Sequence, residues 1–565
     1  MSDNRPVTLD RPALSSIYAA GGVAVLCALF AALCLARFGS PGTIYDVLFD
    51  ERLASEWALA WKSGVPLSDW KMGFGFCPLY HGTLTAYLMF PFFALFEKSW
   101  IFLRLWPILL GVLTLILIYH FVRSLFDRRV AFLTLGFLIL HPPFVMAVRA
   151  GNFQVSYMLL FSVGASYALW SWWKTERLGY FALAVFLMSL GMATRLFFGW
   201  FIMAVFLSAI PLWGFLRRRR CLSTGRAAAR TVAIGFLSTV PVLIPMLITE
   251  LYFFKSHLYL SGTMRKAPAL LNGFKMFENM LSGWFYFWWY FRTTHFKDFF
   301  ELDRVYPWAV LLAAGYLIWR WVRNKQDVFL RKAGWIVTLF GGIFLAASTS
   351  PRDIEFSPHH FIIYPFPQIL LAAAVGEAFS RYRLVRPWKY ALGAAVAALL
   401  LLQGVSLGGF YGRLLTTGAV ERSTDASKAL SSFLNSYHKN NPLSFVACSW
   451  GIAFNLYFLC PDIKFVYRDD HIYHLDDPQR IDSDSLFVYW HIPPVSDTQR
   501  VFEIVVDRIQ KNGSWKLIHT VCEETGTPIF TVYKPDRTRS GGALSISPGD
   551  SRRKITREKG KEHAA

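Results

Sequence analysis

Long apolar runs recur along most of this chain and constrain its fold more than any other feature. About 20 apolar residues are needed to cross the hydrocarbon core of a bilayer. Eleven runs approach or reach that length: 17–38, 103–122, 130–148, 155–173, 179–194, 197–215, 231–249, 307–322, 333–349, 361–379 and 389–411. We therefore expect a mainly α-helical polytopic membrane protein with about 11 transmembrane helices.

The composition agrees with a membrane protein and argues against a nucleic-acid-binding one. Apolar residues make up 54% of the 565 residues and charged residues only 17%, with a mean hydropathy of +0.36. The net charge is +21, but most of the Lys and Arg residues gather in short clusters between the apolar runs. Such clusters are typical of cytoplasmic loops. We therefore expect a membrane partner and no nucleic acid.

The basic clusters also predict the orientation. They follow the second, fourth, sixth, eighth and tenth runs, on the same side as residues 1–16. The positive-inside rule makes that side cytoplasmic. The first run, with no A-x-A-like cleavage site, is expected to be a retained signal anchor. We expect an integral protein of the bacterial inner (plasma) membrane with a cytoplasmic N-terminus and a periplasmic C-terminal domain.

The predicted transmembrane domain, 17–411, has two large outer loops. Loop 39–102 contains an apolar segment, Pro78 to Phe96, and counting it as a span would invert every later loop. We therefore interpret it as a helix at the outer membrane interface. Loop 250–306 is rich in aromatic residues, as expected of interfacial anchoring.

The composition becomes that of a soluble domain after about residue 424. Residues 424–535 alternate helix-like and strand-like segments and predict a small α/β domain. The expected helices are 423–437 and 499–511, and the expected strands are 443–447, 485–490, 515–521 and 528–533. Residues 536–565 are basic and serine-rich and predict a disordered tail.

Charged residues near the outer ends of the runs are the candidates for chemistry. Asp50 and Glu51 stand at the start of a helix-forming stretch, where they could hold and deprotonate an acceptor or simply cap the helix. Arg149 and Arg195 end apolar runs on the same side. A charge near lipid costs about 2–3 kcal/mol, and a phosphate suits the planar guanidinium fork. The alternative is that each Arg reaches out to lipid headgroups.

The sequence resembles the GT-C glycosyltransferases over roughly residues 15–380, in particular glycosyltransferase family 39, the protein O-mannosyltransferases, and the lipid A aminoarabinose transferases. The first similar motif is Asp50-Glu51, which resembles the Asp-Glu motif of the family's first loop. The others follow in the family's order: Cys77–Tyr80 (CPLY), Arg104–Pro107 (RLWP), Arg123–Arg129 (RSLFDRR), Gly191–Arg195 (GMATR) and His360–Pro367 (HFIIYPFP).

This resemblance implies a GT-C-like fold and an inverting transfer of a sugar from a polyprenyl-phosphate donor to a protein, lipid or glycan. It makes Asp50 the general base, with Glu51 orienting the acceptor or the base. It implies that the lipid phosphate is bound by Arg195, His360 and Tyr364. Arg149 joins this set because of its position on the second outer loop.

One departure from the family bears on substrate and activity. Asn152 stands where the family usually has an Asp, and an amide cannot act as a base. The acceptor and the sugar could therefore differ from those of the named members, and an inactive copy stays open.

The sequence leaves two other function classes to consider, a transporter or lipid flippase and a non-catalytic scaffold. A transporter or lipid flippase should show paired, broken spans, and His141-Pro142-Pro143 is the one such break inside a run. A non-catalytic scaffold for the 424–535 domain would leave the outer arginines unexplained. No CxxC or HExxH spacing indicates a metal site, although a divalent metal stays open.

Overall fold

A computed structural model gives the fold of this chain. It describes residues 11–36, 49–64, 84–96, 100–149, 153–216, 225–257, 277, 281, 305–348, 361–381, 386–417, 426–448, 450–466, 484–491, 515–523 and 526–536. The chain divides into two compact units, Met1–Asp425 and Ala426–Ala565.

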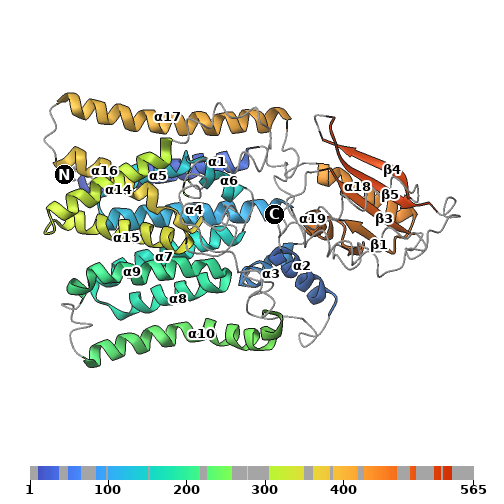
Figure 1. Cartoon of the computed structure of the whole chain (residues 1–565), viewed down its shortest axis with the longest axis horizontal. Coiled ribbons are helices and arrows are strands. Elements are labelled where there is room, and N and C mark those ends of the chain that lie inside the picture. Colours follow the sequence, from blue (N-terminus) through green and yellow to red (C-terminus); the bar gives the residue numbers. More distant parts are fainter. Residues whose placement is uncertain are drawn as a thin grey trace, which may run out of the picture. The chain divides into compact units, whose positions relative to one another are not determined.

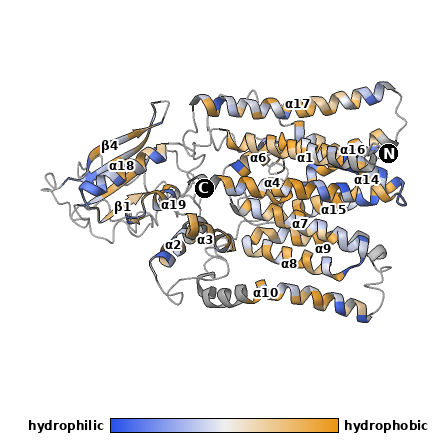
Figure 2. Cartoon of the chain, turned by 180° about the vertical axis from the view of Figure 1, so that it is seen from behind, coloured by the Kyte–Doolittle hydropathy of each residue, from blue (hydrophilic) through white to orange (hydrophobic). Residues whose placement is uncertain are grey.

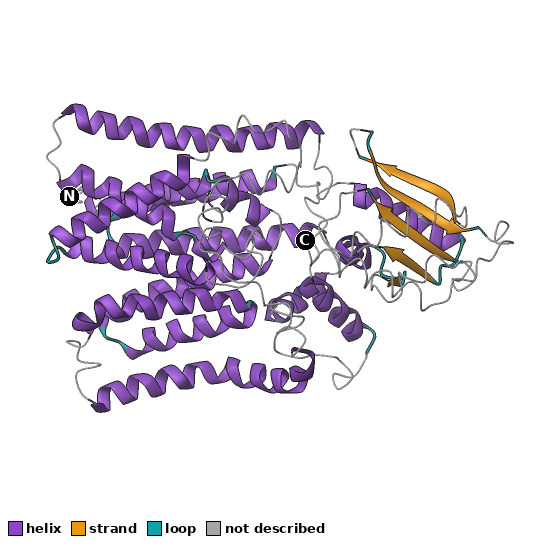
Figure 3. Cartoon of the chain, in the orientation of Figure 1, coloured by secondary structure: helices purple, strands orange, loops and turns teal. Residues whose placement is uncertain are grey.

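The N-terminal unit is built from helices, which Figure 3 colours purple. In chain order they are α1 (Arg11–Leu35), α2 (Phe49–Lys62), α3 (Leu84–Phe96), α4 (Trp100–Leu125), α5 (Arg128–Ile139), α6 (Pro142–Arg149), α7 (Phe153–Thr175), α8 (Leu178–Thr194), the 3-10 helix η2 (Leu196–Phe198), α9 (Gly199–Leu216), α10 (Gly225–His257), α14 (Val305–Arg323), α15 (Val328–Ser348), α16 (Phe366–Arg381) and α17 (Arg386–Thr417).

The helices of this unit are apolar along most of their lengths (Figure 2). Within the described residues, six stretches are long and apolar enough to span a bilayer, or seven if the bent pair α5 and α6 counts as one span. Only 17% of the residues of such a stretch in α17 are buried within the protein, and only 28% of those in α1. Apolar side chains on these exposed faces suit contact with lipid. The chain is therefore an integral membrane protein.

Each of the eleven predicted runs coincides with helix, but their number as complete spans stays a prediction. The run 130–148 does not form one continuous helix. It forms two helices, α5 and α6, that meet at an angle of 64° around His141. Two prolines follow His141, and proline is tolerated in the first turn of a helix but not in its interior. The predicted interfacial segment contains α3, and residues 78–83 lie outside the described part.

Close approaches of small residues let some helices pack tightly. A Cβ built on Gly342 of α15 would lie 2.9 Å from the Cα of Ala204 in α9. Only glycine permits this backbone separation. The α9 and α15 pair is thereby held at a distance that a larger residue would increase.

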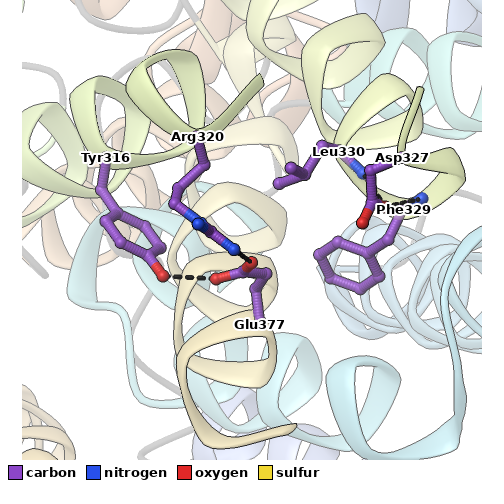
Figure 4. Close-up of polar contacts among 6 residues, drawn as sticks. All are labelled: Tyr316, Arg320, Asp327, Phe329, Leu330 and Glu377. Atoms are coloured by element: carbon purple, nitrogen blue, oxygen red, sulfur yellow. Dashed lines mark hydrogen bonds and ion pairs between the residues drawn. The ribbon is translucent and has the colours of Figure 1, made fainter. Parts of the chain in front are cut away.

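A buried ion pair joins α14 to α16 (Figure 4). The guanidinium of Arg320 donates to Glu377 Oε1 from Nη2 at 2.8 Å and from Nε at 3.2 Å. The hydroxyl of Tyr316 donates to the other carboxylate oxygen of Glu377. Glu377 is completely buried. Three hydrogen bonds therefore satisfy a carboxylate that would otherwise be very costly at this depth.

A side chain caps the N-terminus of α15. Asp327 accepts hydrogen bonds from the backbone N–H groups of Phe329, at 2.8 Å, and Leu330, at 3.2 Å (Figure 4). These donors have no partner within the first turn of a helix. The side chain of Asp327 thus sets the point where α15 begins.

The C-terminal unit contains a five-stranded sheet in the order β2-β1-β3-β5-β4. Its elements are α18 (Ala426–Asn440), β1 (Phe445–Cys448), α19 (Trp450–Leu459), β2 (Phe465–Val466), β3 (Ser485–Trp490), β4 (Trp515–Cys522) and β5 (Pro528–Pro535). Strand β1 is parallel to β2 and β3, whereas β5 is antiparallel to β3 and β4. The predicted small α/β domain therefore has a mixed sheet.

Helix α18 packs its apolar side against this sheet. Leu430 and Leu434 are fully buried. Phe433 stacks on His519 of β4 with ring centroids 4.0 Å apart. The expected helix 423–437 and four strands match α18, β1, β3, β4 and β5 within a few residues. Helix α19 and the short strand β2 were not predicted, and the expected helix 499–511 and tail 537–565 lie outside the described residues.

Candidate functional site

The two predicted acidic residues lie in the first turn of α2. The structure describes the backbone of Asp50 and Glu51 as helical, and their side chains lie outside the described part. Carboxylates at this position are favoured by the positive end of the helix macrodipole. The helix carrying them is short and apolar on one side, where Ala54, Trp57 and Ala58 are buried.

Helix α3 supports α2 and connects it to the bundle. The ring of Trp57 in α2 lies 4.8 Å from that of Tyr87 in α3. Phe92 of α3 in turn lies 4.4 Å from Trp106 of α4. The indole of Trp106 donates to the hydroxyl of Tyr157 in α7 at 2.8 Å. The acidic turn is thus attached to the membrane helices at the end of the unit where α3 and α6 lie (Figure 1).

Arg149 is the last residue of α6 and is 3% exposed. Its Nη2 donates to the backbone carbonyl of Ala36 at 2.8 Å, and its guanidinium lies over the ring of Tyr411. The hydroxyl of Tyr411 donates to the carbonyl of Leu33. Both carbonyls lie at the C-terminus of α1, where the macrodipole attracts a cation. Arg149 therefore holds the end of α1, and its assignment to lipid phosphate stays a prediction.

Arg195 stands between α8 and η2, where the chain changes direction. It is 3% exposed, and its backbone is extended rather than helical. Its backbone N–H donates to the carbonyl of Gly191 at 3.2 Å, and its carbonyl accepts from the backbone N–H of Phe198 at 3.0 Å. A Cβ on Gly191 would lie 2.3 Å from the ring of Phe198. The glycine of the GMATR motif is thus required for the turn that positions Arg195.

Tyr364 precedes α16 and is 1% exposed. Its hydroxyl lies 2.9 Å from Nε2 of His141. The other ring nitrogen of His141, Nδ1, lies 2.9 Å from Nε2 of Gln403 in α17. His141 is fully buried, with its ring centroid 4.6 Å from that of Tyr306. Two buried polar contacts therefore link α17, the break between α5 and α6, and a predicted site residue before α16.

Aromatic contacts place Tyr364 between the elements that carry the two arginines. Phe361, three residues before it, stacks on Phe144 of α6, with centroids 5.9 Å apart. Phe366, two residues after it, lies 6.3 Å from Phe201 of α9. Helix α6 ends at Arg149, and α9 begins shortly after Arg195. His360 lies outside the described residues.

Sequence reasoning used His141 only as a helix break, and it did not single out Gln403 or Glu377. A signal was present in each case. Each is an isolated polar residue inside a long apolar run, and such residues are costly in a membrane unless they have a partner or a role. Among the described residues, no group of three or more His, Cys, Asp or Glu side chains could hold a metal ion.

Comparison with known sequences bears on part of this region. The family model for dolichyl-phosphate-mannose-protein mannosyltransferase matches residues 80–244. The matched segment includes α3 to α9 and both Arg149 and Arg195. Comparison with the curated proteins gives no match.

Solved structures share the fold at low sequence identity. The chain is similar to ArnT from Cupriavidus metallidurans bound to undecaprenyl phosphate, with a TM-score of 0.52 and 12% identity over 93% of this chain and 99% of that chain. It is also similar to the archaeal oligosaccharyltransferase AglB from Archaeoglobus fulgidus in complex with an inhibitory peptide and a dolichol-phosphate, with a TM-score of 0.54 and 11% identity over 94% of this chain and 75% of that chain. The resemblance to GT-C glycosyltransferases is confirmed.

Proposed function

We propose that this protein is an inverting glycosyltransferase that moves a sugar from a polyprenyl-phosphate donor to a protein, lipid or glycan acceptor on the periplasmic face of the bacterial inner membrane. The observation that carries the proposal is the mannosyltransferase match to residues 80–244, which covers both buried outer arginines. Two solved proteins of similar fold carry undecaprenyl phosphate and dolichol-phosphate, which supports a lipid-phosphate donor.

The reaction replaces one bond to the anomeric carbon of the sugar with another. The acceptor hydroxyl or amine attacks that carbon from the face opposite the lipid phosphate, so the configuration inverts. Asp50 takes the acceptor proton as the new bond forms, and Glu51 orients the acceptor or the base. The bond between the anomeric carbon and the phosphate oxygen breaks, and the polyprenyl phosphate leaves with its electron pair.

Charge develops on the phosphate as it leaves, and the binding residues offset that charge. Arg195 offers a planar guanidinium, whose paired N–H groups match phosphate oxygens. His360 and Tyr364 add donors from the HFIIYPFP motif, and Arg149 adds a second guanidinium while it holds the end of α1. A low-dielectric surrounding strengthens each of these interactions. No step of this scheme is assigned to a cofactor.

The test uses purified full-length protein reconstituted in lipid nanodiscs. It is incubated with polyprenyl-phosphate sugars that carry a labelled sugar, together with membranes that supply acceptors. We expect labelled acceptor and free polyprenyl phosphate in equal amounts. Intact donor that only changes leaflet would favour a flippase and contradict the proposal.

Arg195 variants test the phosphate site within the same assay. Arg195→Ala removes a charge-assisted contact, which should weaken donor use about ten- to a hundredfold. Arg195→Lys should retain part of the activity because it keeps the positive charge. Equal loss in both variants, or no loss in either, would count against this role for Arg195.

A further inference from the structure

The hydrogen-bond chain through His141 has a direction that can be derived from its partners. Gln403 presents its amide nitrogen, Nε2, to Nδ1 of His141 at 2.9 Å. With this nitrogen toward Nδ1 the amide donates, so Nδ1 accepts and carries no hydrogen. The hydrogen of a neutral imidazole then lies on Nε2, which faces the hydroxyl of Tyr364 at 2.9 Å.

The consequence for Tyr364 concerns its own hydrogen. Because Nε2 of His141 donates to the phenol oxygen, that oxygen acts as an acceptor in this contact. The O–H hydrogen of Tyr364 must therefore be directed away from His141. The chain Gln403 to His141 to Tyr364 consequently delivers a donor at its far end. An imidazole of the opposite tautomer would instead accept the O–H of Tyr364 and withdraw that donor.

The location of the chain fits a positioning role better than a stabilising one. His141 is fully buried and Gln403 is 1% exposed. They lie 262 residues apart in sequence, His141 at the break between α5 and α6 and Gln403 in α17. Well-packed apolar residues can replace buried polar groups at little cost or with a gain in stability, so stability alone does not require an imidazole and an amide here. A requirement for one tautomer does explain both residues.

We propose that Gln403 and His141 are positioning residues that fix the phenol O–H of Tyr364 as a donor to the phosphate of the polyprenyl ligand. Gln403 selects the tautomer of His141, and His141 sets the direction of the Tyr364 hydroxyl. Neither residue touches the ligand. This inference rests on the proposed function, because Tyr364 contributes only if the site binds a lipid phosphate.

The experiment measures the binding of undecaprenyl phosphate to the full-length protein in nanodiscs. Tyr364→Phe removes the terminal donor and should weaken binding about ten- to a hundredfold. Gln403→Leu leaves Tyr364 in place but removes the hydrogen bond that selects the tautomer of His141. It should weaken binding several-fold, up to about tenfold. His141→Phe should weaken binding at least as much as Gln403→Leu. Only variants that are monodisperse are compared, and Gln403→Leu suffices if His141→Phe does not fold.

Coupling between the variants separates positioning from a general structural effect. If Gln403 acts through Tyr364, then Gln403→Leu should have no further effect once Tyr364→Phe is present. The matched control is Gln368→Leu. Gln368 is a fully buried amide of α16, one helical turn after Tyr364, and it takes no part in the chain. Its replacement should leave binding unchanged.

The outcomes distinguish the proposed function from the positioning role of Gln403 and His141. Failure of the wild-type protein to bind undecaprenyl phosphate would overturn the proposed function and this inference with it. Weaker binding by Tyr364→Phe together with normal binding by Gln403→Leu would overturn the inference alone. The inference would also fail if the effects of Gln403→Leu and Tyr364→Phe were simply additive. Loss in the single variants with no further loss in the double variant supports it.

Discussion

Removal of one partner from the buried ion pair between α14 and α16 should destabilise the helical unit strongly. Glu377 is completely buried, whereas the side chain of Arg320 is 20% exposed. Breaking a buried pair costs about 3–5 kcal/mol, because the remaining charge stays in a low-dielectric region. Arg320→Leu leaves the fully buried carboxylate and should approach about 5 kcal/mol, at the upper end of this range.

Glu377→Leu should cost less than Arg320→Leu. The guanidinium that it leaves behind is partly exposed and can turn its charged end toward water or headgroups, so we expect about 3 kcal/mol. Tyr316→Phe removes one hydrogen bond to a charged acceptor and should cost about 1.5–3 kcal/mol. The double variant Arg320→Leu/Glu377→Leu leaves no unpaired charge at this pair and should be close to the wild type in stability.

The assay is equilibrium unfolding by SDS in mixed micelles, followed by tryptophan fluorescence. Asp327→Asn is the matched control in the neighbouring turn, since Asn caps helices about as well as Asp, and it should change stability by less than about 1 kcal/mol. The reasoning is refuted if either single charge-removing variant matches the wild type. It is also refuted if the double variant is as unstable as the sum of the two single variants.

Two further predictions concern a glycine and a histidine. Gly191→Ala places a Cβ 2.3 Å from the ring of Phe198, and the overpacking should lower stability by about 1–3 kcal/mol. The control Gly315→Ala, with nothing within 4 Å of the added Cβ, should not lower stability. Equal losses of stability for both variants in SDS unfolding would contradict this prediction. Burial lowers the pKa of His491 from its usual 6.5, so the unfolded chain binds more protons than the folded one and stability falls as the pH drops below about 6.5. His491→Gln should reduce this loss in thermal unfolding of the full chain between about pH 5 and 8, and an unchanged pH dependence would show that His491 is not its source.

The helices were predictable from sequence because long apolar runs have few alternatives in a membrane. The break at His141 was visible in its two following prolines, but its angle and its buried surroundings were not. The C-terminal strands whose side chains alternate in polarity, or that end at clear turn residues, were also predictable from sequence. Helix α19 was missed because its sequence, WGIAFNLYFL, is apolar on all sides and lacks a helical period. Strand β2 has only two residues, too few for any pattern.

The candidate site was only partly predictable for a different reason. Asp50, Arg149 and Arg195 could be singled out because charge is rare at the membrane ends of apolar runs. The contact of Tyr364 with His141 joins positions 223 residues apart, and no local pattern encodes that pairing. The anchoring of α1 by Arg149 was likewise hidden, because the acceptor is a backbone carbonyl, which every residue carries.

Asp50→Asn tests the central claim most directly. A positioned general base contributes about 10²- to 10⁴-fold in rate, so the purified variant should lose transfer from polyprenyl-phosphate sugar by that factor. Its folding should survive, because Asn keeps the shape of the side chain and the loss of one charge in the first turn of α2 costs only about 0.3–1 kcal/mol. Asp46→Asn, four residues earlier and with no assigned role, is the matched control and should keep most of the activity. Transfer by monodisperse Asp50→Asn protein at close to the wild-type rate would contradict the account.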